Sequence, residues 1–229
     1  MADNIARVFA DAIASDPTRP LLTWYDDATG ERTELSGATL ANWVAKTANL
    51  LVDELALSPG DTAGALLPPH WQTAAVLLGC WSAGLTVVDR PGDVDVLFAA
   101  ADRVTEAQEW SAGDRYALAL DPFALPMREV PAGFADYVLE VRGHGDHFTP
   151  PPTGGPGDAD LLARAADRAT ELCLASGDRV LFDAAAHPDP VDWLLAPLTA
   201  GASIVLCGNL DPSRLDARLA AEKVTRSLA

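Results

Sequence analysis

Lysine is nearly absent from this 229-residue sequence, which contains only Lys46 and Lys223. Chemistry that depends on a lysine side chain therefore has two candidates. Long apolar runs are missing too, since none approaches the ~20 residues that cross a bilayer. The first fifteen residues lack the basic start and the continuous apolar stretch of a signal peptide. We therefore expect a cytoplasmic protein with no membrane partner.

Basic residues are scarce as a class, because 16 Lys and Arg face 33 Asp and Glu, which gives a formal net charge of −17. Such an acidic chain repels nucleic acid and anionic membranes, so we expect no nucleic-acid partner. The excess of acid is also compatible with a simple role in solubility.

Short motifs of common enzyme classes are missing from the sequence. It has no G-x-S-x-G elbow, no G-x-G-x-x-G turn, no Walker A loop and no C-x-x-C pair. Cys80, Cys173 and Cys207 lie far apart among apolar residues, so we expect buried free thiols. These patterns indicate no catalytic residue and no cofactor.

The histidines offer one candidate metal cluster. His144, Asp146 and His147 stand close together in RGHGDHF, and two histidines with an acid could bind a metal. A separated third ligand would be needed, and His70 and His187 are the only histidines left. We favour a polar loop here and predict no metal site.

The first ninety residues alternate helices with short apolar strands. Asp3 is expected to cap the first helix and Ser36 the long second helix. Between them a β-hairpin is expected to turn at Gly30. Apolar strands are expected over 62–67 and 85–89, on either side of a third helix.

The middle of the chain has a weaker pattern. Strands are expected over 94–98, 115–120 and 136–142, with a short helix over 105–110. After a proline-rich stretch, helices and strands alternate again over 158–224. This alternation predicts an α/β fold with a helix-covered, mostly parallel sheet.

Two blocks of the chain resemble the adenylate-forming enzymes, the superfamily of acyl-CoA synthetases and AMP-binding enzymes. The first block, 20–88, contains L-x-PGD, LLPPHW and the LGCWSAG helix. The second, 177–207, contains a Gly-Asp strand, a loop histidine and a helix that ends in Pro-Leu-x-x-Gly, and EKVT follows it. The chain resembles a truncated actinobacterial relative of the amino-terminal half of these enzymes, whose members are more than twice as long.

The resemblance implies one domain over 1–229, similar to part of the amino-terminal domain of the superfamily. We expect a main lobe formed by 1–93 together with 158–229, and a smaller middle lobe over 94–148. Four strands from the two ends of the chain should then share one sheet, with 62–67 and 85–89 beside 179–183 and 202–207.

The resemblance also implies a position for a phosphate-binding loop. In the superfamily this loop reads Ser/Thr-Gly-Thr-Thr-Gly-x-Pro-Lys-Gly, and its amides, hydroxyls and lysine hold the phosphates of ATP. In this chain the lysine is missing and Asp158, whose carboxylate repels phosphate, follows the loop. We expect a degenerate cofactor-binding position without ATP, formed by Thr153, Gly154, Gly155 and Gly157.

Four residues are candidates for lining a pocket. His187 corresponds to the loop histidine that borders the acyl pocket in the superfamily. Asp183, His187 and Asp189 could form an acid–base group, with a capped loop as the alternative. His70 and Trp71 open a helix, where they could line a pocket or pack in the core. The pocket candidates are His187, Asp183, His70 and Trp71.

Two functional hypotheses from different classes follow. The first is a catalytically inactive remnant that acts by binding or scaffolding, without ATP-dependent acyl activation. The alternative is an enzyme, or a binder of acyl or nucleotide ligands, that reuses the acyl pocket. The missing loop lysine favours the first hypothesis, and we lean against an enzyme. We also expect either a symmetric homodimer, formed through the carboxy-terminal strands or the Trp193 helix, or a monomer; an unidentified protein partner is a further alternative.

Overall fold

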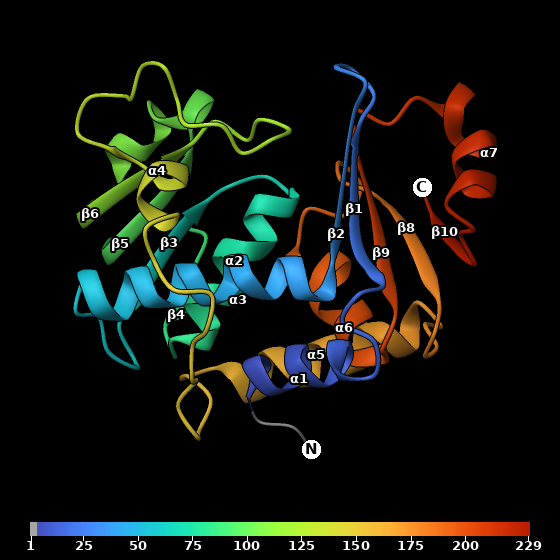
Figure 1. The fold of residues 1–229 in the computed structure, drawn as a ribbon, viewed down its shortest axis with the longest axis horizontal. Coiled ribbons are helices and arrows are strands. Elements are labelled where there is room, and N and C mark those ends of the chain that lie inside the picture. Colours follow the sequence, from blue (N-terminus) through green and yellow to red (C-terminus); the bar gives the residue numbers. More distant parts are fainter. Residues whose placement is uncertain (1–3) are drawn as a thin grey trace. The chain divides into compact units, whose positions relative to one another are not determined.

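The computed structural model describes residues 4–229, which divide into two compact units (Figure 1). The described part of the first unit comprises 4–40, 69–74 and 159–229, and the second comprises 41–68 and 75–158. Within these residues, no helix combines the length and the apolar character that crossing a membrane requires.

The first unit is built on a five-stranded sheet in the order β10-β8-β9-β1-β2. β1 and β2 are antiparallel and the other neighbours are parallel. The predicted hairpin is confirmed, and Gly30 (φ +79°) supplies the left-handed conformation of its turn. The strands are β1 (Pro20–Asp26), β2 (Glu31–Ser36), β8 (Arg179–Asp183), β9 (Ser203–Gly208) and β10 (Arg226–Leu228).

Apolar side chains alternate between the two faces of this sheet, as the two-residue period of a strand requires. On one face, Leu181, Val205 and Cys207 pack with Leu215 and Leu219 of α7. On the other face, alternate residues of the same strands are also buried, and α6 contacts β9 and α1 there. The helical segments are α1 (Ile5–Ala14), α5 (Asp158–Glu171), η4 (Val191–Leu195), α6 (Ala196–Ala200) and α7 (Pro212–Ala221).

Polar side chains cap the amino ends of the first two helices. Ser36 is confirmed as the cap of α2 (Gly37–Asn49), because its Oγ accepts a hydrogen bond from the Thr39 backbone N–H at 3.1 Å. Asp3 lies outside the described residues. The Asn4 side chain caps α1 by accepting a hydrogen bond from the Arg7 backbone N–H at 3.1 Å.

The second unit is built on a parallel sheet in the order β4-β3-β5-β6-β7. Its strands are β3 (Thr62–Leu66), β4 (Thr86–Val88), β5 (Asp93–Ala100), β6 (Ser111–Leu118) and β7 (Ala135–Asp136). The helical segments associated with it are α2, η1 (Leu50–Glu54), α3 (Trp71–Ser82), η2 (Ala101–Arg103), η3 (Glu106–Glu109) and α4 (Tyr137–Val141). The predicted α/β class with mostly parallel strands is therefore confirmed.

The expectation of one sheet shared by both ends of the chain was wrong. β3 and β4 belong to the sheet of β5–β7, whereas β8 and β9 pair with each other and β9 also pairs with β1. Residues 41–68 and 75–93 consequently group with the middle of the chain. Local patterns predict a strand, but its neighbours depend on packing between distant segments.

Two local predictions also need correction. The predicted strand over 136–142 is a two-residue strand followed by α4, because the Asp136 side chain caps a helix by accepting a hydrogen bond from the Val138 backbone N–H at 2.9 Å. Cys80 and Cys207 are buried as expected, but Cys173 is exposed. Cys173 follows the last turn of α5 with φ +52°, where the chain leaves the helix.

Candidate functional site

Segment 153–157, the expected phosphate-loop position, is a tightly packed connection in the second unit. A Cβ atom added to Gly155 would lie 2.7 Å from the carbonyl oxygen of Gly84. The Gly155 carbonyl oxygen accepts a hydrogen bond from the Asp158 backbone N–H at 3.2 Å, and Thr86 Oγ1 donates to the Pro156 carbonyl oxygen at 3.4 Å. Thr153, Gly154 and Gly157 lie in this same segment, and Asp158 is 1% exposed.

Carboxylates gather at the carboxyl edge of the first sheet. In open α/β sheets this edge is the usual place for a ligand. Here Asp27 follows β1, Asp183 ends β8, and Asp211 follows β9. The buried guanidinium of Arg218 contacts Asp27, with Nη1 at 3.0 Å from Oδ2. Arg214 lies 3.6 Å from Asp27 and 3.5 Å from Asp211, so three carboxylates face two guanidinium groups. The remaining net negative charge disfavours a phosphate ester at this edge.

His187 forms an oriented pair with a carboxylate that the sequence reasoning did not select. Its Nδ1 lies 3.1 Å from Oδ2 of Asp192, whose two oxygens accept hydrogen bonds from Nε and Nη2 of Arg168 at 2.8 and 3.1 Å. Burial favours the neutral form of Asp192, but the bonds from Arg168 and His187 outweigh it and lower its pKa. The edge of the His187 ring faces Phe182, with ring centroids 5.4 Å apart.

The two expected acid partners of His187 have other roles. The Asp183 carboxylate accepts a hydrogen bond from the Ala185 backbone N–H at 3.0 Å, and the Asp189 carboxylate pairs with Arg164 at 3.0 Å. Asp192 could have been found from the sequence, because it is an acid in the first turn of η4, five residues after His187. Arg168 on α5 could not, because no short motif connects it with Asp192 or His187.

His70 and Trp71 lie in the core of the first unit. His70 is 2% exposed, and its Nδ1 accepts a hydrogen bond from the Gln72 backbone N–H at 3.1 Å at the start of α3. The ring centroids of His70 and Trp24 are 4.7 Å apart, in an edge-to-face arrangement. Burial lowers the pKa of His70 to about 3, so the ring is neutral at pH 7. These contacts are separate from those of His187.

The candidate metal ligands of the 144–147 loop face other partners in the second unit. His144 Nε2 lies 2.9 Å from a carboxylate oxygen of Glu54, and Asp146 pairs with Lys46 at 2.6 Å. The His147 carbonyl oxygen accepts a hydrogen bond from the Asn49 side chain at 3.0 Å. Over 4–229, His, Cys, Asp and Glu form no group of three or more that could hold a metal ion.

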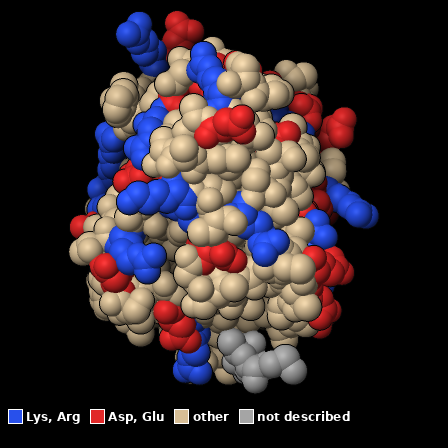
Figure 2. Space-filling view, turned by 90° about the vertical axis from the view of Figure 1, so that its right-hand side faces the viewer, with Lys and Arg blue, Asp and Glu red and all other residues tan. Residues whose placement is uncertain are grey.

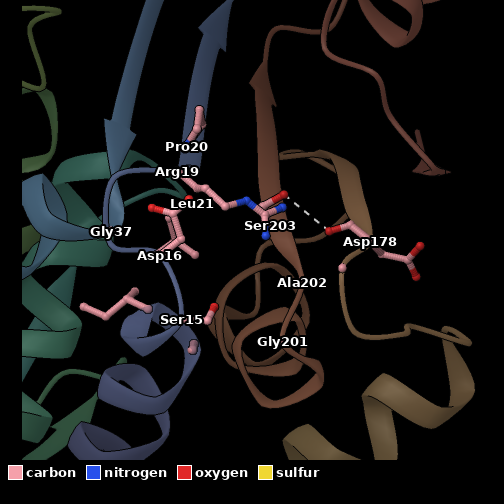
Figure 3. A pocket seen from close by; sticks show the side chains of 13 residues that line it. Ser15, Asp16, Arg19, Pro20, Leu21, Gly37, Asp178, Gly201, Ala202 and Ser203 are labelled. Atoms are coloured by element: carbon pink, nitrogen blue, oxygen red, sulfur yellow. Dashed lines mark hydrogen bonds between the residues drawn. The ribbon is translucent and has the colours of Figure 1, made fainter.

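Two neighbouring cavities of the first unit were not foreseen from the sequence. One, of about 40 Å³, lies between the amino ends of β1 and β9, where Figure 3 shows the side chain of Arg19 extending toward Ser203. The other is a groove of about 480 Å³ that shares Arg19 and Ser203 with the first and is also lined by Arg179 and Lys223. Of these lining residues, the sequence pointed only to Lys223, as one of the two lysines available for chemistry.

The chain is similar in sequence to a mycobacterial protein and similar in fold to several solved structures. No family model matches the chain. A protein of Mycobacterium tuberculosis described as "TIGR03089 family protein" is 47% identical over 228 residues, and the match covers 94% of both chains.

Several solved structures that resemble the chain are acyl-CoA synthetases and related ligases. A Brucella canis acyl-CoA synthetase superposes with a TM-score of 0.73 at 18% identity, over 98% of this chain and 46% of its own. The anthranilate CoA ligase AuaEII, solved with anthranoyl-AMP, gives 0.72 at 13% identity, over 98% and 49%. The N-terminal domain of FACL13 from Mycobacterium tuberculosis gives 0.69 at 13%, over 99% and 62%. The chain thus has the fold of these enzymes' amino-terminal part and spans about half of their length.

Proposed function

The chain belongs to the TIGR03089 family, and from that premise we propose that it acts by binding, without ATP-dependent activation of an acyl group. The fold it shares with acyl-CoA synthetases supplies a scaffold in which the superfamily's phosphate-binding position is degenerate.

One observation carries the proposal: segment 153–157 contains no basic side chain and packs against backbone. Binding of a triphosphate needs backbone N–H groups that face the ligand and a cation that neutralises it. Gly155 lies too close to Gly84 to admit even a methyl group without a shift, and the residue after the loop is the acid Asp158.

Titration calorimetry with ATP and magnesium tests this proposal. We expect no saturable heat up to millimolar nucleotide, while a full-length acyl-CoA synthetase measured in parallel provides the positive control. Saturable binding of ATP with micromolar affinity would contradict the proposal.

The His187–Asp192 pair supports a second candidate function, general-base catalysis on a small substrate. Arg168 fixes the Asp192 carboxylate with two hydrogen bonds, and Asp192 orients His187 through Nδ1. Among the described residues, His187 Nε2 makes no hydrogen bond, so it is available to accept a proton. A screen of p-nitrophenyl esters would favour this candidate if the wild type hydrolysed one of them and His187→Gln did not.

We also propose self-association through the edge strand β10. Over residues 4–229, β10 is the last strand in its sheet and pairs only with β8, and an unpaired strand edge can pair with a second chain. Trp193 is 1% exposed, so its side chain is not available for that contact. Light scattering at micromolar concentration should give the mass of a dimer, and a single-chain mass over the whole range would rule out this contact.

A further inference from the structure

The 480 Å³ groove of the first unit has a local charge opposite to that of the whole chain. Its lining includes four basic side chains and two carboxylates, a local excess of two positive charges, whereas the formal net charge of the chain is −17. Figure 2 shows the side of the molecule that carries α7, where Lys and Arg side chains are prominent beside Asp and Glu. The charged lining residues are Arg19, Arg32, Arg179, Lys223, Glu34 and Glu222.

The groove lies on the face of the first sheet that packs against α7, beyond the end of that helix. Strand register places Arg32 opposite Tyr25 and Glu34 opposite Thr23, so both charged side chains point to the α7 face. Helix α7 covers the carboxyl half of this face and ends at Ala221. The amino half therefore carries polar and charged side chains in place of an apolar cover.

Glu222 holds two of the arginines in place. Its Oε1 accepts hydrogen bonds from Arg32 Nε and Nη2 at 3.1 and 2.9 Å and from the Tyr25 hydroxyl at 2.6 Å, and its Oε2 accepts from Arg179 Nη2. Burial alone would raise the pKa of Glu222, but these bonds outweigh it and lower the pKa. Glu222 is therefore ionised at neutral pH. Among the described residues, Nη1 of Arg32 and of Arg179 makes no hydrogen bond.

The other two cations have no direct partner. Within the part of the chain that the structure describes, the exposed side chains of Arg19 and Lys223 make no hydrogen bond and no ion pair. The charge of Arg19 acts on Asp16, but the Asp16 carboxylate accepts its hydrogen bonds from the backbone N–H and hydroxyl of Thr18, at 3.1 and 2.6 Å. Both cations are thus accessible to a solute that enters the groove.

We propose that this groove binds a small dianion, either a phosphate monoester or a dicarboxylate. Guanidinium groups bind phosphate and carboxylate through paired, charge-assisted hydrogen bonds, and an ammonium group adds a mobile point charge. Two excess positive charges match the two negative charges of such a ligand. Because Glu222 fixes two guanidinium groups beforehand, less conformational entropy is lost on binding. The groove contains neither the phosphate-loop position nor His187, so the inference is independent of the proposed function.

Amide NMR titrations with inorganic phosphate and with succinate test the proposal. In low-salt buffer we expect saturable one-to-one binding of at least one of them, with the largest shifts at the amides of Gly177, Arg179, Ser203, Lys223 and Thr225. The stronger of the two identifies the ligand chemistry. Absence of saturation by both anions at 20 mM, roughly the limit of weak specific binding, or largest shifts outside the groove, would overturn the proposal.

Three charge-matched variants distinguish a specific binding site from a general effect of the net charge. Arg19→Gln and Lys223→Gln should each weaken binding about tenfold, since each removes one charge-assisted contact. Arg7→Gln removes an equal charge from an exposed position of α1 outside the groove, and it should leave the affinity within about twofold. Because neither groove cation makes a hydrogen bond, unfolding midpoints should be unchanged. Equal weakening by all three variants would overturn the proposal.

Discussion

The buried ion pair between Asp27 and Arg218 should be strongly coupled. The exposed fractions of the two side chains are 4% and 6%. Arg218 also lies over the Tyr25 ring, with its guanidinium carbon 4.2 Å from the ring centroid, and Asp27 Oδ2 accepts a hydrogen bond from the Asp211 backbone N–H at 2.7 Å. Removing either charged group alone therefore leaves the other charge buried with fewer partners.

We expect Arg218→Met and Asp27→Leu to lower the free energy of unfolding by about 3 kcal/mol each, because an orphaned buried charge costs about 3–5 kcal/mol. For Arg218→Met the lower end applies because Asp27 retains the Asp211 hydrogen bond and lies 3.6 Å from Arg214. For Asp27→Leu it applies because Arg218 still lies over the Tyr25 ring. The double variant replaces the pair with apolar side chains and leaves no buried charge. It should be no less stable than either single variant.

Urea unfolding followed by circular dichroism measures all four corners of this cycle. If the two losses simply add, to about 6 kcal/mol, the pair is not coupled and the reasoning fails. The Arg218 bond holds the pKa of Asp27 below its usual range, and burial only partly opposes this. The stabilisation is therefore complete above the unfolded-state pKa and is lost as pH falls below about 4. Arg218→Met should reduce that acid sensitivity.

Gly155→Ala should destabilise the protein by about 1–3 kcal/mol, because the new methyl group would lie 2.7 Å from a backbone carbonyl oxygen. Gly92→Ala, at a position with no atom within 4 Å, is the control, and equal unfolding midpoints for the two variants would contradict the packing at 153–157. A thiol reagent at pH 8 should modify Cys173 quickly and leave Cys80 and Cys207 unmodified, because both are buried and burial raises the pKa of Cys207 to about 11. Rapid loss of more than one thiol in the folded protein would contradict this burial.

Features that depend on adjacent residues could be predicted from the sequence. The Ser36 cap requires only a hydroxyl three residues before a free amide, and the turn at Gly30 requires only a residue that tolerates positive φ. The individual strands follow from short apolar runs. A short run such as 136–142 is ambiguous, however, and the side chain of Asp136 decides in favour of a helix.

Features that depend on distant residues could not be predicted in this way. β3 and β4 lie in a second sheet because β3 pairs with β5, and such pairing between separate segments leaves no local sequence pattern. The partner of His187 is Asp192, held by Arg168 from another helix, and no local spacing connects these residues. The cationic groove likewise combines the starts of β1 and β8 with the end of α7, and in the sequence its basic residues stand isolated among acids.

The most direct test of the central claim is ATP–pyrophosphate exchange by the purified protein with a panel of aliphatic and aromatic carboxylic acids. Adenylate formation needs a site that holds the triphosphate, and segment 153–157 offers no cation and packs against Gly84. The account predicts exchange at the background rate for every acid, beside a full-length acyl-CoA synthetase that exchanges in the same assay. Exchange above background with any acid, abolished when ATP is omitted, would contradict it.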